Sequence, residues 1–255
     1  MDEGGHCKPK RPAAGKKSEC PRPYMCHLYI MCSMPQTHSP VARDPRNFTG
    51  LDRLIGQVDQ ALKAVVGPHA STRAYPAEEV AETELDAAQR REIAALMRVN
   101  HSGEVAAQAL YHGQALASKG SDIRDSMLKA SDEERDHLAW CATRIDELGG
   151  RTSMLNPVWY AGSFAIGVLA GLAGDPASLG FLAETEKQVV DHLDAHLSKL
   201  PHGDARTRAV IEQMKEDEAQ HGNMALNAGG IALPSAIRVL MRGCSRVMTR
   251  TARWI

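Results

Sequence analysis

The 255-residue sequence has few aromatic residues, almost no net charge and no long apolar run. Aromatic residues make up 4% of the chain, and no stretch alternates between apolar and polar residues as a half-buried strand does, so β-sheets are not expected. The formal net charge is −1, which gives the whole molecule no bias toward nucleic acid. No apolar stretch reaches the roughly 20 residues of a membrane-spanning helix. Frequent Ala, Leu, Met and Glu favour helices, and the sequence predicts an all-α protein.

Cysteines are scarce outside the N-terminal part of the chain. Four of the six lie within the first 32 residues with the spacing C-x12-C-x5-C-x5-C, which is not typical of a zinc site. The remaining chain is too long and too poor in cysteine for a disulfide scaffold, so we interpret all six as reduced. Residues 1–47 are rich in Pro, Lys, Arg and Ser. We predict that they form a disordered extension before a single domain at residues 48–255.

Helical periodicity, interrupted by Gly and Pro, runs through the predicted domain. Gly67-Pro68 ends the first helix, Gly149-Gly150 ends the third, and Asp175-Pro176 begins the fifth, because Pro is tolerated in a first helical turn and Gly commonly ends a helix. The predicted helices cover about residues 51–67, 79–118, 122–148, 157–173, 175–201, 203–227 and 234–255.

One arrangement of acidic and histidine residues occurs twice in the chain. Each copy has a glutamate and, about thirty residues later, the motif Glu-x-x-His. The i, i+3 spacing places both side chains of the motif on one helix face, one turn apart. Two helical hairpins of similar design predict a four-helix bundle. The two copies are Glu104, Glu134 and His137, and Glu186, Glu218 and His221.

These six residues occupy positions where the helical pattern calls for an apolar side chain. Glu134, for example, lies between Ala130 and Leu138 on one apolar stripe. A buried, unpaired carboxylate costs several kcal/mol, and the stripes contain no Lys or Arg that could neutralise four of them. Four carboxylates and two imidazoles form a ligand set for two metal ions, as in ferritin-like di-iron and di-manganese proteins. Mixed oxygen and nitrogen ligands suit iron or manganese.

Several neighbouring residues have two open interpretations. Glu133 and Asp217 each precede a ligand glutamate. Each could accept the free N–H of the histidine from the opposite hairpin, or be an ordinary surface acid. Tyr111 lies one stripe turn past Glu104 and either lines the metal pocket or belongs to the core. Three further histidines are expected at a helix surface or at the edge of the pocket: His101, His192 and His196.

The last predicted helix is basic and amphipathic. Arg238, Arg242, Arg246 and Arg250 recur at intervals of four residues, and apolar residues fill the other side. Such a helix is typical of an anionic membrane surface; the alternative is a helix packed on the bundle with a solvated arginine ridge. The apolar segment 157–174 is too short to span a membrane and is expected to be buried or interfacial. Together these helices predict a metal site that a lipid-soluble substrate can reach.

Five segments of the chain resemble the demethoxyubiquinone hydroxylase family, and the similarity covers about residues 50–255. "NHSGE" followed by "LYHGQ" is more specific than a general ferritin-like pattern. One departure is Leu193, where eukaryotic members often have a tyrosine. The segments are "RVNHSGEVAAQALYHGQA" (98–115), "EERDHLAW" (133–140), "ETEKQVVDHLDAHL" (184–197), "EDEAQHG" (216–222) and "AIRVLMRGCSRV" (236–247).

This resemblance implies a membrane-associated di-iron monooxygenase of ubiquinone biosynthesis. The implied reaction is O2-dependent hydroxylation of the demethoxyubiquinone ring. The implied iron ligands are the six residues found from spacing; two iron ions per chain form the catalytic centre, and no separate catalytic residue is assigned. The expected partners are the quinone, O2, an anionic membrane surface and other ubiquinone-synthesis proteins, with no nucleic acid. The expected location is the cytoplasmic side of a bacterial cell membrane, or the inner mitochondrial membrane in a eukaryote.

Two other classes of protein compete with this interpretation. A ferritin-like protein that stores iron or reduces peroxide would share the six ligands, but it has no need of membrane-facing helices. A non-enzymatic lipid-binding bundle would keep the apolar helices, but it has no need of six inward polar side chains. The combination of both features favours the hydroxylase.

Overall fold

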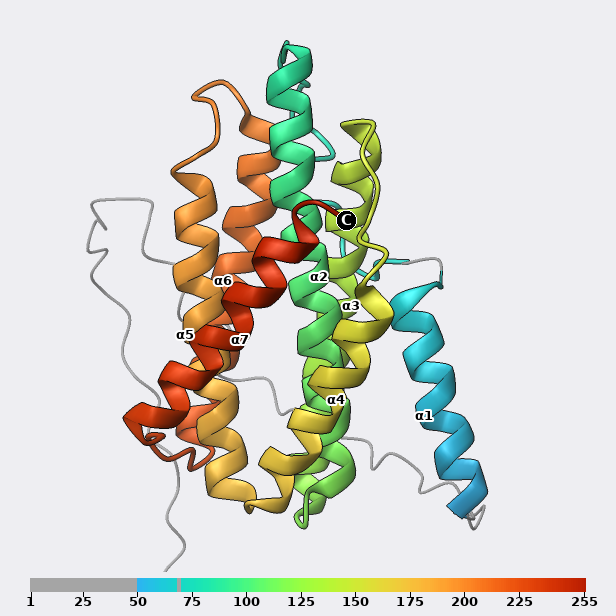
Figure 1. Ribbon diagram of the computed structural model, residues 1–255, viewed down its shortest axis with the longest axis vertical. Helices are drawn as coiled ribbons and strands as arrows, with labels where there is room; N and C mark the ends of the chain where they lie inside the picture. The colour runs from blue at the N-terminus through green and yellow to red at the C-terminus, as the bar shows by residue number, and fades with distance from the viewer. Residues whose placement is uncertain (1–49, 68–69) are drawn as a thin grey trace, which may run out of the picture. The chain divides into compact units, whose positions relative to one another are not determined.

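The computed structural model describes residues 50–67 and 70–255, whose regular structure is entirely helical (Figure 1). They belong to one compact unit, Phe48–Ile255. The predicted disorder of residues 1–47, and the four cysteines within them, lie outside the described residues. The helices are α1 (Gly50–Val65), α2 (Ala87–Ala117), α3 (Ser121–Glu147), α4 (Asn156–Leu172), α5 (Asp175–Leu197), α6 (Ala205–Asn227) and α7 (Ser235–Ala252).

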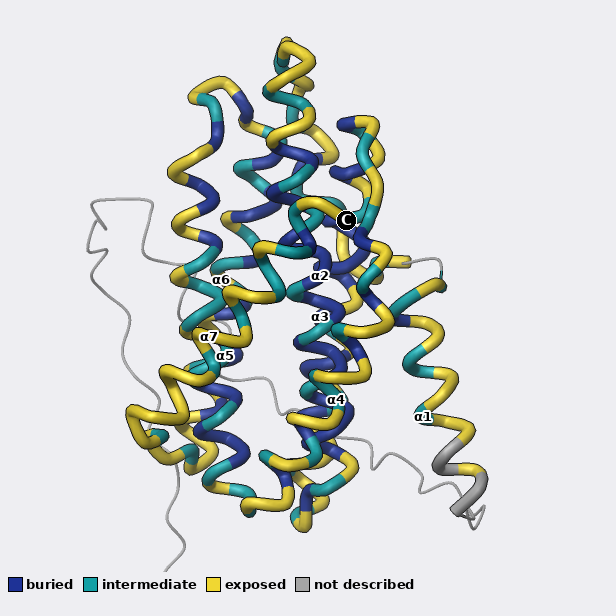
Figure 2. Tube along the Cα trace, in the orientation of Figure 1, coloured by how far each residue is buried: buried dark blue, intermediate teal, exposed yellow. Residues whose placement is uncertain are grey.

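Four of these helices form the predicted ferritin-like bundle. α2 packs along α3 and α5 packs along α6, and the two hairpins meet through α2 with α5 and α3 with α6. Figure 1 shows these four helices running side by side, and Figure 2 shows that buried positions recur along them. The duplicated pattern in the sequence therefore corresponds to two helical hairpins of one bundle, as predicted.

The bundle core has two apolar clusters with polar residues between them. One cluster contains Met97, Trp140 and Met214, and the other contains Tyr111 and Leu182. Along each of the four helices, the predicted metal ligands fall between the residues of these two clusters. The apolar clusters thus close both ends of a polar layer and limit its access to water.

The N-terminus of α2 differs from the prediction. The sequence pattern placed the start of this helix near residue 79, whereas α2 begins at Ala87. Asp86 accepts hydrogen bonds from the backbone N–H groups of Ala88 and Gln89, and the Gln89 side chain accepts one from the Asp86 N–H. This capping box fixes the helix start. Residues 70–86 instead form an irregular segment, called the strap below, which contacts α3 and α6.

Two glycines explain why the apolar α4 can lie so close to α2. A Cβ atom on Gly113 would lie 2.3 Å from the carbonyl oxygen of Phe164, and one on Gly167 would lie 2.3 Å from the carbonyl oxygen of Leu110. Only glycine permits this approach of the two backbones. The outer side of α4 exposes large apolar side chains, including Leu169 at 67%. Within the described part of the chain, every helix is too short or too polar to cross a bilayer.

α7 lies across the bundle and contacts α2 and α5. The residues after it are held by Arg98 on α2, which donates hydrogen bonds to the backbone oxygens of Arg151 at 2.6 Å and Arg253 at 2.9 Å. α7 itself remains largely exposed on its apolar side as well as on its arginine side, with Leu240 exposed by 63%. The packing against the bundle thus leaves apolar surface uncovered.

Candidate metal centre

Four of the six predicted ligands form a tight buried cluster. Glu104 comes from α2, Glu134 and His137 from α3, and Glu218 from α6. One ligand atom from each of the four lies within 4.8 Å of the others. All four are at least 98% buried. This cluster could hold metal ions, because carboxylate and imidazole groups converge in a site from which water is largely excluded.

Two of these glutamates face both histidines of the duplicated motifs. Glu134 places Oε2 at 3.0 Å from His137 Nδ1 and Oε1 at 3.2 Å from His221 Nδ1. Glu218 places Oε1 at 3.1 Å from His137 Nδ1 and Oε2 at 3.2 Å from His221 Nδ1. Each carboxylate thus divides its two oxygens between the two histidines, which is an arrangement that can join two neighbouring cations.

The remaining ligands lie on either side of this pair. Glu104 Oε2 lies 3.7 Å from His137 Nδ1. Glu186 is buried on α5 and accepts a hydrogen bond of 2.7 Å from the Tyr111 hydroxyl. Glu186 and His221 fall outside the four-residue cluster. The structure therefore brings all six predicted residues into one buried polar layer, but only four of them into the tightest group.

Burial and mutual charge strongly shift the protonation of these groups. Burial raises the pKa of Glu104 and Glu186 well above the usual value of a glutamate. Burial acts in the same direction on Glu134, but His137 and His221 outweigh it and lower the pKa of that carboxyl. At His221 burial is outweighed by the nearby carboxylates, which raise its pKa to about 12. The cluster therefore strongly favours added positive charge.

The buried glutamate oxygens have few hydrogen-bond donors in the chain itself, as expected of ligands to bound cations. Glu186 Oε2 is buried and accepts no hydrogen bond, and Glu134 Oε1 and Glu218 Oε1 face histidine Nδ1 atoms at 3.2 and 3.1 Å. Leaving such an acceptor unsatisfied costs about 1–3 kcal/mol, and more for a charged group. Two divalent cations would allow all four glutamates to ionise, because their four positive charges would balance four negative charges. The donor set therefore fits two metal ions.

Two further acids contact the histidines on the side away from the cluster, which is one of the two interpretations that the sequence left open. His137 Nε2 lies 3.0 Å from Asp217 Oδ2, and His221 Nε2 lies 2.7 Å from Glu133 Oε2. Each acid belongs to the hairpin opposite its histidine. An acid that accepts the Nε2–H leaves Nδ1, which faces the carboxylate cluster, free to bind a cation. The surface-acid interpretation of these two residues is wrong.

Of the three histidines expected at a helix surface or at the edge of the pocket, two do not lie at a surface. His101 and His196 are buried, and His192 is half-buried. His196 Nδ1 lies 2.8 Å from Asn100 Oδ1, and Asn156 on α4 reaches His101 Nδ1 at 3.3 Å. Burial lowers the pKa of His192 to about 4. Contacts with Asn100 on α2 and Asn156 on α4 therefore hold two of these histidines inside the molecule, and helical periodicity alone does not reveal such contacts.

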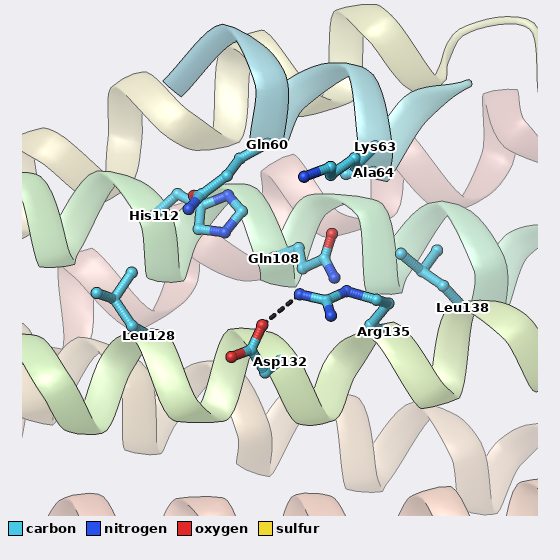
Figure 3. Close-up of a pocket in the computed structure, with 9 residues that line it drawn as sticks. All are labelled: Gln60, Lys63, Ala64, Gln108, His112, Leu128, Asp132, Arg135 and Leu138. Carbon is cyan, nitrogen blue, oxygen red and sulfur yellow. Dashed lines mark hydrogen bonds and ion pairs between the residues drawn. The ribbon is translucent and has the colours of Figure 1, made fainter. Parts of the chain in front are cut away.

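A surface pocket lies apart from the six predicted ligands, between α1, α2 and α3 (Figure 3). Its empty space, which is partly open to solvent, is about 590 Å³. His112 lines it and lies 2.7 Å from both the Tyr160 and the Ser131 hydroxyl. Both ring nitrogens are thus satisfied by the chain itself. The lining residues are Gln60, Lys63, Ala64, Gln108, His112, Leu128, Asp132, Arg135 and Leu138.

The fold and the buried cluster define a class of protein: a ferritin-like helical bundle with a buried carboxylate–histidine cluster between two hairpins that could hold metal ions. Comparison with known families narrows this class. Residues 91–252 match the family described as ubiquinone biosynthesis protein COQ7. This match spans more than half of the chain, and the chain therefore belongs to the COQ7 family.

Curated relatives carry the same enzymatic name. The chain is 56% identical to the 3-demethoxyubiquinol 3-hydroxylase of Nitrosococcus oceani over 211 residues, which are 82% of this chain and 99% of that protein. It is 56% identical to the enzyme of that name from Cupriavidus necator, over 79% of this chain and 99% of the relative. The one from Acinetobacter baumannii is 53% identical over 82% of this chain and its whole length.

Proposed function

We propose that this chain is a 3-demethoxyubiquinol 3-hydroxylase that uses O2 and two bound iron ions. The observation that carries the proposal is the placement of Glu134 and Glu218, which each turn one oxygen toward His137 and the other toward His221. A carboxylate pair of this kind suits two metal ions, and the named relatives supply the substrate class. The catalytic domain in this proposal is residues 48–255.

The six residues have distinct roles in holding the ions. Glu104 and His137 would hold one ion, Glu186 and His221 the other, and the two central glutamates would bind both. When bound, a pair of ferrous ions supplies the electrons that activate O2. The Tyr111 hydroxyl donates to Glu186 and thereby fixes one of its oxygens.

The surface of α4 and α7 supports delivery of the quinone from a membrane. Leu169 and Leu172 on α4, and Val239 and Leu240 on α7, are each at least 60% exposed. Arginines on α7 lie beside these apolar residues and suit anionic headgroups. The chain would accordingly act as a peripheral protein on the cytoplasmic side of a bacterial cell membrane, where other ubiquinone-synthesis proteins could also contact it.

A rescue experiment tests substrate and site together. A bacterial strain that lacks its own enzyme and accumulates demethoxyubiquinone would receive wild-type chain, Glu218→Gln or Glu216→Gln. Glu218 is buried in the cluster, whereas Glu216 is exposed on the same helix. We expect wild type and Glu216→Gln to clear the intermediate and Glu218→Gln to leave it.

The purified proteins supply the second measurement. We expect two iron ions per chain in wild type and in Glu216→Gln, and fewer in Glu218→Gln. Rescue by a protein without iron would refute the metal centre. Two iron ions per chain without any change in the extracted quinones would instead favour an iron-handling or peroxide-reducing protein.

A further inference from the structure

We infer that Arg73 is a positioning residue for the His137 half of the metal centre, and that the two metal positions are therefore unequal. The inference rests on the proposed function, because it concerns the same six ligands. Arg73 lies in the strap, outside residues 91–252 that the family match covers. In the sequence it belongs to no helical stripe and to neither of the duplicated motifs.

Arg73 binds Asp217, the acid that contacts Nε2 of His137. Its Nη1 lies 2.6 Å from Asp217 Oδ2 and its Nη2 lies 3.3 Å from Asp217 Oδ1. The same Oδ2 lies 3.0 Å from His137 Nε2. A guanidinium that contacts both oxygens of a carboxylate fixes its plane as well as its position. Arg73 therefore acts on the imidazole through Asp217.

A second contact links the same guanidinium to His137 through Trp140. Its central carbon lies 4.8 Å from the centre of the Trp140 ring. The Trp140 ring in turn lies 5.3 Å from the His137 ring. A cation over an aromatic face is attracted by the π-electrons. Arg73 thus fixes the two neighbours that determine how the imidazole can tilt.

The strap is anchored so that Arg73 has little freedom. The backbone N–H of Thr72 donates to Asp136 Oδ1 at 2.7 Å, and the Ser71 hydroxyl donates to the same oxygen at 3.0 Å. Asp136 is buried and directly precedes His137 on α3. The residues before Arg73 are therefore tied to the turn of α3 that carries the ligand.

The acid that contacts His221 is held less firmly than the acid that contacts His137. Its outer acid is Glu133, whose side chain is 36% exposed, compared with 12% for Asp217. Glu133 forms an ion pair with Lys129, at 3.8 Å and with 79% of the lysine side chain exposed, and Arg73 attracts Glu133 less strongly than it attracts Asp217. Such a surface ion pair contributes little. His137 therefore contacts a largely buried acid that Arg73 holds, whereas His221 contacts an acid that is partly exposed to solvent.

Cobalt(II) binding to the purified full chain tests this difference, because Co(II) has visible absorption bands that depend on the geometry of each site. His137→Ala and His221→Ala would first assign the bands to the two positions. Arg73→Met keeps an unbranched side chain over Trp140 but removes both bonds to Asp217. Arg208→Met is the matched control, since Arg208 pairs with Glu212 at 3.8 Å on the surface of α6.

We expect Arg73→Met to weaken Co(II) binding about 10–100-fold at the position that His137→Ala identifies. The absorption bands of that position should shift, and the affinity and bands of the other position should stay unchanged. Arg208→Met should match wild type at both. Equal weakening at both positions, or an altered melting temperature of the metal-free protein without any change in Co(II) binding, would overturn the inference. Wild type that binds fewer than two Co(II) ions would instead refute the proposed metal centre.

Discussion

Two regions of this molecule reverse the usual placement of side chains. The middle of the bundle buries four carboxylates, among them Glu134 with no exposed surface, whereas α4 and α7 expose large apolar residues such as Leu169. Each reversal costs free energy in the isolated chain, since buried charge loses hydration and exposed apolar surface orders or excludes water. In our proposal, each region is complementary to something outside the polypeptide: cations for the first and lipid for the second.

The largest expected effect comes from neutralising a carboxylate that faces both histidines. Glu134→Gln keeps the size of the side chain but removes the charge between His137 and His221. We expect loss of both metal ions and a decrease in hydroxylation of more than about 100-fold, because this loss should exceed the 10–100-fold cost of removing an outer acid. Iron per chain and quinone turnover measure the effect. Full metal content in Glu134→Gln would mean that this carboxylate is not shared.

Metal removal should show how strongly the buried charges depend on cations. A ligand at about 1,000 times its dissociation constant stabilises a folded protein by about 4 kcal/mol. We therefore expect that adding a chelator to the loaded protein lowers its free energy of unfolding by about this amount. Urea denaturation with and without chelator measures the difference. Equal stabilities would show that the chain balances these carboxylates without metal.

His112 is a useful contrast to the carboxylate cluster, because it is a buried polar residue whose two ring nitrogens find hydrogen-bond partners within the chain. Burial lowers its pKa to about 4. An unfolded histidine titrates near pH 6.5, so the unfolded chain binds this proton first as pH falls, and stability decreases between about pH 6.5 and 4 by on the order of 3 kcal/mol.

His112→Gln cannot titrate in this range, and the comparison with wild type isolates the histidine from other acid-sensitive groups. We expect the variant to lose less stability than wild type when urea denaturation is measured at pH 6.5 and again at pH 4.5. Parallel losses in the two proteins would show that His112 is not held in its neutral form.

The smallest expected effect concerns the surface of α7. Arg238 and Arg246 are exposed, with apolar residues beside them. Each arginine near an anionic bilayer contributes about 1 kcal/mol, so Arg246→Gln should weaken binding to phosphatidylserine-containing vesicles about fivefold at low salt. Arg208→Gln on α6 is the control and should bind like wild type. Vesicle binding that is insensitive to both salt and Arg246→Gln would contradict an electrostatic role for α7.

Much of the metal centre could be predicted from spacing. Helical geometry places residues three apart on one face, so the two Glu-x-x-His motifs had to present paired ligands, and their positions on apolar stripes required burial. The acids behind the histidines, Glu133 and Asp217, followed from the same geometry. The prediction was less successful where contacts do not follow a helical period. His101 is buried and is reached by Asn156 on α4, which lies outside the repeated hairpins, and His196 is buried against Asn100.

The sequence by itself determined the helices, the two hairpins and the six polar residues directed inward, because helical periodicity and the cost of buried charge are properties of local sequence. Tertiary structure alone decided how the oxygens of Glu134 and Glu218 divide between two histidines, and that Arg73 binds Asp217, the acid that contacts His137. These contacts join segments far apart in the chain, such as the strap and α6, which are separated by 144 residues at Arg73 and Asp217. No local pattern records such a pairing, since it depends on how the packed helices and the strap meet in space.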